Sequence, residues 1–131
     1  MRMSEHGIAM REPTYFVLAS LLDGPLHGYG IIKRAGELSA GRVKLATGTL
    51  YTALDRLAGE GYVKLVSEEI VAGRVRRAYA LTGAGLTALQ AEAARMEQAA
   101  RVVSAVSRPA TAGGTVVAAR RPRASRRVRP A

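Results

Sequence analysis

The sequence predicts a small domain of the α+β class that is mainly α-helical. Three observations lead to this prediction. Three short helical stretches come first, a β-rich hairpin follows them, and a long stretch with a heptad pattern of apolar residues comes last. With 131 residues, of which 48% are hydrophobic, the chain can form one domain of ordinary size with one modest core.

Composition and charge limit the possible function classes. The net charge is +10, which favours a partner rich in phosphate, such as nucleic acid or a lipid surface. Six arginines and no acidic residue lie in residues 109–131, so the rest of the chain is only mildly basic. Cysteine is absent, which excludes a disulfide framework and a thiolate metal site. We expect no cofactor and no metal.

No apolar run approaches the roughly 20 residues that are needed to span a bilayer. The N-terminal residues carry scattered charges and lack the apolar core of a signal peptide. The sequence therefore predicts a cytoplasmic protein without a membrane segment.

The first two helices are predicted from their end signals and apolar faces. Residues 12–14 resemble a helix start with proline in the first turn, an apolar stretch follows, and residues 23–25 (DGP) end it. A second helix is expected from about His27 to Leu38, with Ile31 and Ala35 on its apolar face. Its three glycines weaken it, which close packing against a neighbouring backbone would explain.

The third helix has the clearest pattern. Thr47 can cap its start, and Gly59 and Gly61 follow its end. Its buried stripe is formed by Leu50, Leu54 and Leu57. The face opposite this stripe carries Thr49, Thr52 and Arg56.

The period of the pattern then changes from helical to about two. Residues 62–67 predict one strand, with Val63 and Leu65 on the same side, and residues 75–81 predict a second strand, with Tyr79 and Leu81 inward. The glycine-containing link between them indicates a β-hairpin. Arginines lie at its tip and on its return strand, namely Arg74, Arg76 and Arg77.

A final helix is expected from about Ala84 to Ser104, and its apolar residues alternate at spacings of three and four. This a/d pattern predicts a helix that pairs with another helix. The predicted dimerisation residues are Leu86, Leu89, Ala93, Met96, Ala100 and Val103. Residues 1–11 show no period and are expected to be loose, while the Arg- and Pro-rich residues 107–131 are expected to be disordered.

Helix, helix, helix, hairpin and long helix is the order of a winged helix-turn-helix domain (residues 12–82) with an appended dimerisation helix (residues 83–106). In such a domain the third helix can enter the major groove of duplex DNA, and the arginines of the hairpin suit the flanking minor groove or its phosphates. The candidate DNA-binding residues are Lys44, Thr47, Thr49, Tyr51, Thr52, Arg56, Arg74, Arg76 and Arg77.

Four motifs in family order resemble those of the PadR family of transcriptional regulators. Residues 26–31 are similar to the family's "HGY" helix opening, and residues 47–57 to its "S-x-G-T-L-Y-x-x-L-x-x-L" recognition helix. Residues 60–63 resemble "E-G-L-I", and residues 76–85 resemble "R-K-x-Y-x-L-T-x-x-G". The resemblance implies a homodimer that binds an inverted-repeat operator, acts as a repressor and is released by a small-molecule inducer. The chain resembles the short members of the family, which have a single C-terminal helix.

Two features depart from the family pattern. Thr52 stands where proline is frequent, and the arginine-rich tail from Ser107 has no counterpart. The tail leaves open whether DNA affinity resides in the winged domain alone.

Several roles also stay open. Tyr51 flanks the leucine stripe, so partial burial and a phosphate contact are both possible. Arg76 and Arg77 alternate along a strand, so only one is expected to point at DNA, while the other packs or pairs. His27 is expected to cap or pack at the start of its helix.

Two other function classes compete with specific DNA binding. One is a winged-helix module for protein–protein contact, and the other is a binder of RNA or acidic lipid that depends on the tail. No arrangement of residues supports an enzyme.

Overall fold

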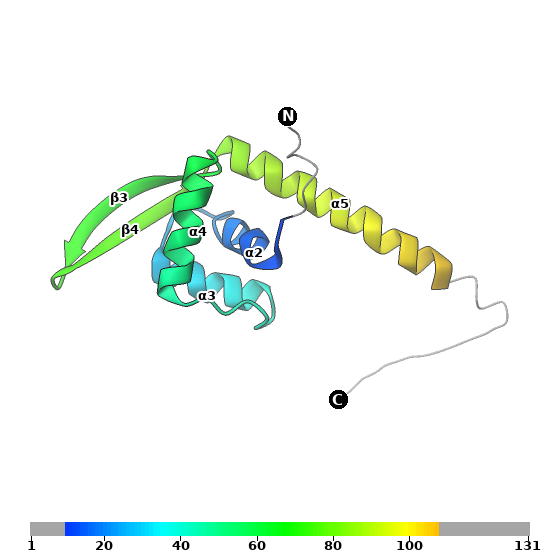
Figure 1. Cartoon of the computed structure of the whole chain (residues 1–131), viewed down its shortest axis with the longest axis horizontal. Coiled ribbons are helices and arrows are strands. Elements are labelled where there is room, and N and C mark those ends of the chain that lie inside the picture. The colour runs from blue at the N-terminus through cyan, green and yellow to red at the C-terminus, as the bar shows by residue number, and fades with distance from the viewer. Residues whose placement is uncertain (1–9, 108–131) are drawn as a thin grey trace. The chain divides into compact units, whose positions relative to one another are not determined.

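The computed structural model describes residues 10–107. The elements in chain order are α2 (Glu12–Ser20), β2 (Leu26–His27), α3 (Gly28–Leu38), α4 (Thr47–Gly59), β3 (Val63–Val71), β4 (Arg74–Leu81) and α5 (Gly83–Ser107) (Figure 1). This order confirms the predicted α+β class and the winged helix-turn-helix arrangement. The expected loose arm and disordered tail lie almost entirely outside the described residues. None of the helices in residues 10–107 combines the length and the apolar character that a bilayer crossing requires.

The chain divides into two units, one ending at Ala93 and one beginning at Ala94, and α5 runs through the boundary. The first unit holds the hydrophobic core. Its fully buried centre is formed by side chains from α2, α3 and α4, and the sheet and the first turns of α5 close around it. The buried core residues are Val17, Leu18, Leu21, Ile31, Leu50, Leu54, Leu57, Val63, Tyr79 and Leu89. The predicted leucine stripe of the third helix is therefore confirmed.

A short strand that the sequence analysis missed precedes α3. Leu26 and His27 pair antiparallel with Tyr79 and Ala78, so the sheet has three strands in the order β2-β4-β3. Two residues are too few to show an alternating pattern, and the sequence therefore gave no strand signal here. His27 occupies the N-cap position of α3, yet its side chain makes no capping hydrogen bond. Within residues 10–107, its Nε2 atom is buried without a hydrogen-bond partner.

Two glycines are required by close approaches between elements. A Cβ atom at Gly28 would collide with the hydroxyl of Tyr51, so the first turn of α3 lies directly against a side chain of α4. A Cβ atom at Gly85 would collide with the backbone carbonyl of Tyr62, which fixes the start of α5 against the chain that leads into β3. The second helix was expected to pack its glycines against a neighbouring backbone, but at Gly28 the close neighbour is a side chain, that of Tyr51. At Gly30 and Gly36 a Cβ atom would meet only ordinary contacts.

β3 and β4 form a hairpin that we call the wing (residues 63–81). Its strands are joined by Ala72 and Gly73, which both have positive φ angles (52° and 76°), as a tight two-residue hairpin turn requires. The pairing register shifts by one between Leu65 and Ser67, so Val66 forms a bulge. The wing is longer than predicted. Val63 is buried whereas Leu65 is 47% exposed, because the strand leaves the core after Val63.

The start of α5 is fixed by Thr82. Its hydroxyl accepts a hydrogen bond from the backbone N–H of Gly85 (3.0 Å) and donates one to the carbonyl of Gly61 (2.6 Å). This side chain therefore caps α5 and ties it to the turn after α4.

Candidate nucleic-acid interface

The N-terminal turn of α4, the predicted recognition helix, begins with three consecutive exposed residues. Ala46, and not Thr47, is its N-cap residue, so the sequence-based assignment of Thr47 as the cap is wrong. Thr47 is the first helical residue, and no side-chain hydrogen bond caps this end within the described chain. The first helical hydrogen bond is donated by Leu50 to the carbonyl of Ala46, so the N–H groups of the three residues before Leu50 have no such bond.

This uncapped end can attract anions. The unpaired N–H groups and the helix dipole give it a partial positive charge, and Thr47, Gly48 and Thr49 are all exposed there. Lys44 is also exposed, three residues before the helix, and adds a full positive charge. Phosphate oxygens are the ligands that such a group of donors can bind.

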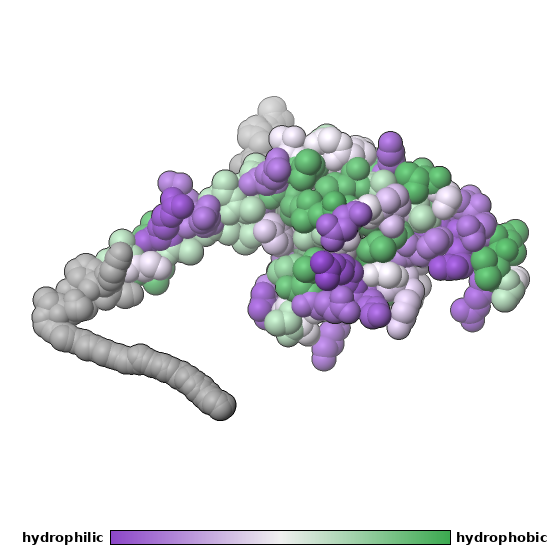
Figure 2. All heavy atoms as spheres, turned by 180° about the vertical axis from the view of Figure 1, so that it is seen from behind, coloured by the Kyte–Doolittle hydropathy of each residue, from purple (hydrophilic) through white to green (hydrophobic). Residues whose placement is uncertain are grey.

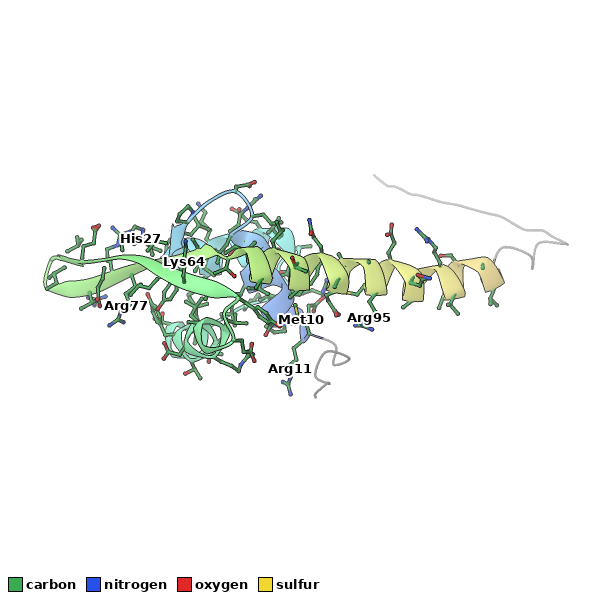
Figure 3. All side chains as sticks on the ribbon, turned by 90° about the horizontal axis from the view of Figure 1, so that it is seen from above. Met10, Arg11, His27, Lys64, Arg77 and Arg95 are labelled. Atoms are coloured by element: carbon green, nitrogen blue, oxygen red, sulfur yellow. The ribbon has the colours of Figure 1, made fainter. Side chains whose placement is uncertain are left out.

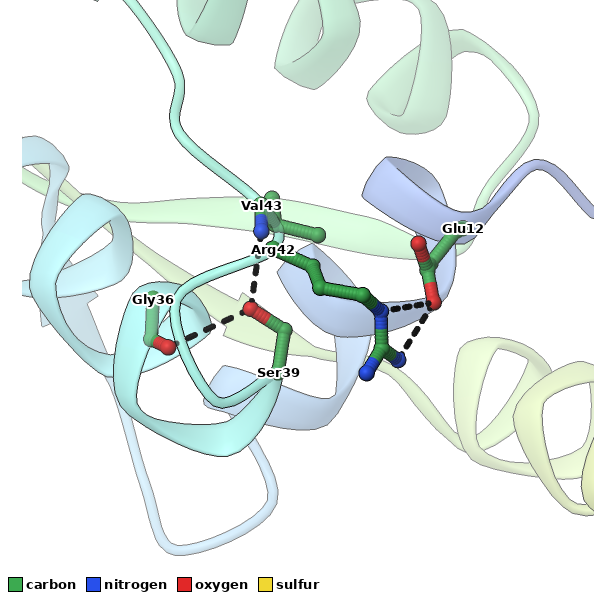
Figure 4. Close-up of polar contacts among 5 residues, drawn as sticks. All are labelled: Glu12, Gly36, Ser39, Arg42 and Val43. Atoms are coloured by element: carbon green, nitrogen blue, oxygen red, sulfur yellow. Dashed lines mark hydrogen bonds and ion pairs between the residues drawn. The ribbon is translucent and has the colours of Figure 1, made fainter.

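The loop that carries Lys44 is held in place by Ser39, which is buried (Figure 4). Its hydroxyl accepts a hydrogen bond from the backbone N–H of Val43 (2.9 Å) and donates one to the carbonyl of Gly36 (3.2 Å). Val43 is itself buried, so the residue next to Lys44 is anchored.

An exposed ion pair joins the same loop to α2. The Arg42 guanidinium donates two hydrogen bonds to one carboxylate oxygen of Glu12, at 3.0 Å from Nε and 2.6 Å from Nη2 (Figure 4). This bonding lowers the pKa of the Glu12 carboxyl and raises the pKa of Arg42. The loop is thus tied to the first helix as well as to the core.

The exposed face of α4 is less uniform than the sequence pattern suggested. Thr52, Asp55 and Arg56 are all exposed, and Asp55 lies on the side opposite the leucine stripe. A carboxylate there repels phosphate. Contact with DNA phosphates is therefore favoured on the N-terminal half of α4, where no acidic residue lies.

Arg56 has partners within its own chain. Its guanidinium donates a hydrogen bond to the hydroxyl of Thr14 in α2 (3.3 Å) and forms an ion pair with Glu60 (3.7 Å). Arg56 also lies seven residues after Thr49, which is about 10 Å further along the helix axis. These contacts favour a role in positioning α4 against α2 over the base contact predicted from the sequence.

Tyr51 and Tyr29 have different environments at the junction of α3 and α4. Tyr51 is half-buried, and its ring fills the space over Gly28. Tyr29, the next residue of α3, is 77% exposed, and Lys33 one turn later is also exposed. Neither Tyr29 nor Lys33 could be selected as a site residue from the sequence, because exposure beside another helix leaves no periodic signal. We call the exposed residues of this region the reading surface, which comprises Tyr29, Lys33, Lys44, Thr47, Thr49 and Thr52.

The three arginines of the wing lie on two faces. Arg77 is half-exposed and forms an ion pair with Glu68, opposite it in the ladder (2.9 Å), whereas Arg74 and Arg76 are exposed on the other face. In Figure 3 the side chain of Arg77 leaves the wing on the side of α4. Its pairing agrees with the expectation that one of two adjacent arginines pairs within the chain.

The predicted dimerisation residues also differ in their surroundings. Leu89 belongs to the core of the first unit and is not available for a helix partner, which corrects its assignment to the seam. Ala93 is half-buried, whereas Leu86, Met96, Ala100 and Val103 are exposed.

Comparisons with known proteins agree with this architecture. Residues 17–91 match the model of the transcriptional regulator PadR-like family. The chain is 39% identical over 88 residues to the transcriptional regulator Rv3488 of Mycobacterium tuberculosis, and the match covers 66% of this chain and 78% of that protein.

Solved structures show the same fold. A PadR family transcription regulator from Clostridium difficile has 26% identity and a TM-score of 0.59, with 73% of this chain and 98% of that chain covered. Bacillus subtilis PadR, solved in complex with operator DNA, has 25% identity and a TM-score of 0.53 over 61% of this chain and 46% of that chain. The family model covers more than half of the sequence, and the chain therefore belongs to the PadR-like family of transcriptional regulators.

Proposed function

We propose that this chain is a sequence-specific DNA-binding repressor that acts as a homodimer on an inverted-repeat operator. The observation that carries the proposal is the uncapped, exposed N-terminus of α4, with Lys44 beside it and threonine side chains on its first turns. A helix of this kind fits the major groove, where threonine can donate or accept hydrogen bonds and contact the methyl group of thymine. The likeness to a PadR protein solved with operator DNA supports the same function.

Dimerisation is proposed from α5. Leu86 and Met96 are exposed although they are large and apolar, and Val103 continues their 3-4 spacing. A second copy of the helix would remove these side chains from water. Two copies related by a twofold axis would place two α4 helices on the two halves of an inverted repeat.

The proposal is tested by titration of the full chain against two labelled duplexes. One duplex carries an inverted repeat from the intergenic DNA upstream of the chain's own gene, and the other has the same base composition in shuffled order. We expect at least a thousand-fold preference for the first duplex at physiological salt. Equal affinity for the two duplexes would contradict specific recognition and favour binding through the basic tail.

A further inference from the structure

The tip of the wing carries an exposed pair of apolar side chains. Ile70 and Val75 lie directly opposite each other in the ladder, close to the two-residue turn, and are 75% and 50% exposed. Figure 2 shows apolar side chains gathered at this end of the hairpin. Charged or polar residues are the usual choice at the end of a ribbon that extends into water, so this pair needs an explanation.

The pair lies on the face of the wing that is turned toward α4. Along β4, Val75, Arg77 and Tyr79 share one face because side chains alternate and the register shift lies on β3. Tyr79 is buried, and it lies in the same core cluster as Leu50, Leu54 and Leu57 of α4. Tyr79 therefore faces α4, and Val75 lies four residues, or about 13 Å, further out on the same side.

Charge is distributed unequally over the two faces. On the α4 side, Arg77 is paired with Glu68, so the surface beside Ile70 and Val75 is nearly neutral. On the opposite side, Arg74 and Arg76 are exposed. The α4 side thus combines the apolar pair with a neutral ion pair, whereas the opposite face carries Arg74 and Arg76 together with Val71 and Glu69.

Stability of the hairpin does not account for the pair. Cross-strand packing covers only the surfaces that the two side chains turn to each other. Ile70 nevertheless keeps three quarters of its surface exposed, so most of it is left for another contact.

We propose that Ile70 and Val75 form an apolar contact with the minor groove of the duplex whose adjacent major groove receives α4. The inference rests on the proposed function, since it needs the same DNA. Branched apolar side chains can pack against the walls of the minor groove and widen it, while Arg74 and Arg76 reach phosphates at its edge. Because no counterion is released by an apolar contact, its contribution to affinity is independent of salt.

The test compares two matched substitutions in the full chain. Val75→Thr and Val71→Thr make the same chemical change beside the turn, on opposite faces of the wing. Affinity for the inverted-repeat duplex is measured at four salt concentrations, with a hydroxyl-radical footprint of the minor groove. We expect Val75→Thr to weaken binding by roughly three- to ten-fold at every salt concentration and to lose protection beside each half-site. Val71→Thr should change binding by less than about two-fold.

Two further variants separate the contact from other effects. Val75→Ile keeps the apolar surface and should bind like the wild type. This result would show that the loss of affinity in Val75→Thr comes from the lost apolar surface and not from a misfolded hairpin. Arg76→Ala should lower the slope of log affinity against log salt by about one, whereas Val75→Thr should leave the slope unchanged.

The inference is overturned if both threonine variants bind like the wild type, or if both lose the same affinity. If both variants bind like the wild type, Ile70 and Val75 would instead be assigned to contact with a protein partner. If the wild type prefers its operator and Val75→Thr does as well, only this inference fails. If the wild type shows no preference, the proposed function fails and this inference with it.

Discussion

Ser39 determines the course of the loop that leads into α4. Its hydroxyl satisfies the buried N–H group of Val43, which has no other hydrogen bond in the described loop. Ser39→Ala should lower the free energy of unfolding by about 1–3 kcal/mol, because this N–H group would be left unsatisfied. Urea unfolding measures the change. Ser67→Ala, at an exposed position of the wing, is the control and should have an effect within about 0.5 kcal/mol. Equal effects of the two substitutions would contradict the role of Ser39.

The ion pair between Glu12 and Arg42 predicts a pH dependence of stability. The pKa of Glu12 is lowered in the folded chain, so folding is favoured while the carboxylate is ionised in both states. This contribution is present above the ordinary pKa of a glutamate, about 4.3, and is lost as the pH falls through the lowered value. The difference in melting temperature between the wild type and Glu12→Gln should therefore be largest near neutral pH and disappear at low pH. A difference that grows on acidification would contradict this account.

Within α4, Thr49 and Arg56 have different roles, although the sequence pattern placed them on one face. Thr49 lies in the exposed first turn, whereas the guanidinium of Arg56 is held by Thr14 and Glu60. Thr49→Ala should change the preference at one base pair of each half-site, by about 1–3 kcal/mol. Arg56→Ala should weaken binding to all duplexes about equally, because it loosens the position of the helix. Titrations against single-base variants of the operator distinguish the two outcomes, and a base-specific loss for Arg56→Ala would reverse these roles.

The helices and the wing could be predicted because their signals are local. The leucines of α4 recur at helical spacing, and the link of Ala72 and Gly73 lies between two alternating strands. The family's glycines could be recognised from the sequence, but the close contacts that require them could not. Gly28 and Gly85 are required by Tyr51 and by the carbonyl of Tyr62, which are distant along the chain.

The candidate site was predicted less completely than the fold. Periodicity places Arg56 on an exposed face but cannot show that its charge is already paired with Glu60. The same limit applies to Leu89, since a heptad position can serve a dimer or the core of its own chain, and the structure places it in the core. Tyr29 was missed because exposure is a tertiary property.

At the scale of the whole molecule, α5 should control the oligomeric state. Met96 is exposed in the second unit, so Met96→Asp should abolish dimerisation without unfolding the first unit. Gln98→Asp, at another exposed position of α5, is the control and should leave the dimer intact. Leu89→Asp cannot serve as this test, because a buried charge in the core would unfold the domain. Sedimentation velocity at micromolar concentration measures the result, and a wild-type monomer would contradict the proposal.

We expect the winged domain to provide sequence specificity and the basic tail to add affinity for phosphate. The test is the ratio of affinities for operator and shuffled duplex, measured for the full chain and for residues 1–107 at the same two salt concentrations. Both affinities should fall without the tail while their ratio is kept, because the tail contributes only phosphate contacts. The shorter chain should also show a flatter salt dependence. A ratio that falls to about one when residues 108–131 are removed would show that specificity does not reside in the reading surface.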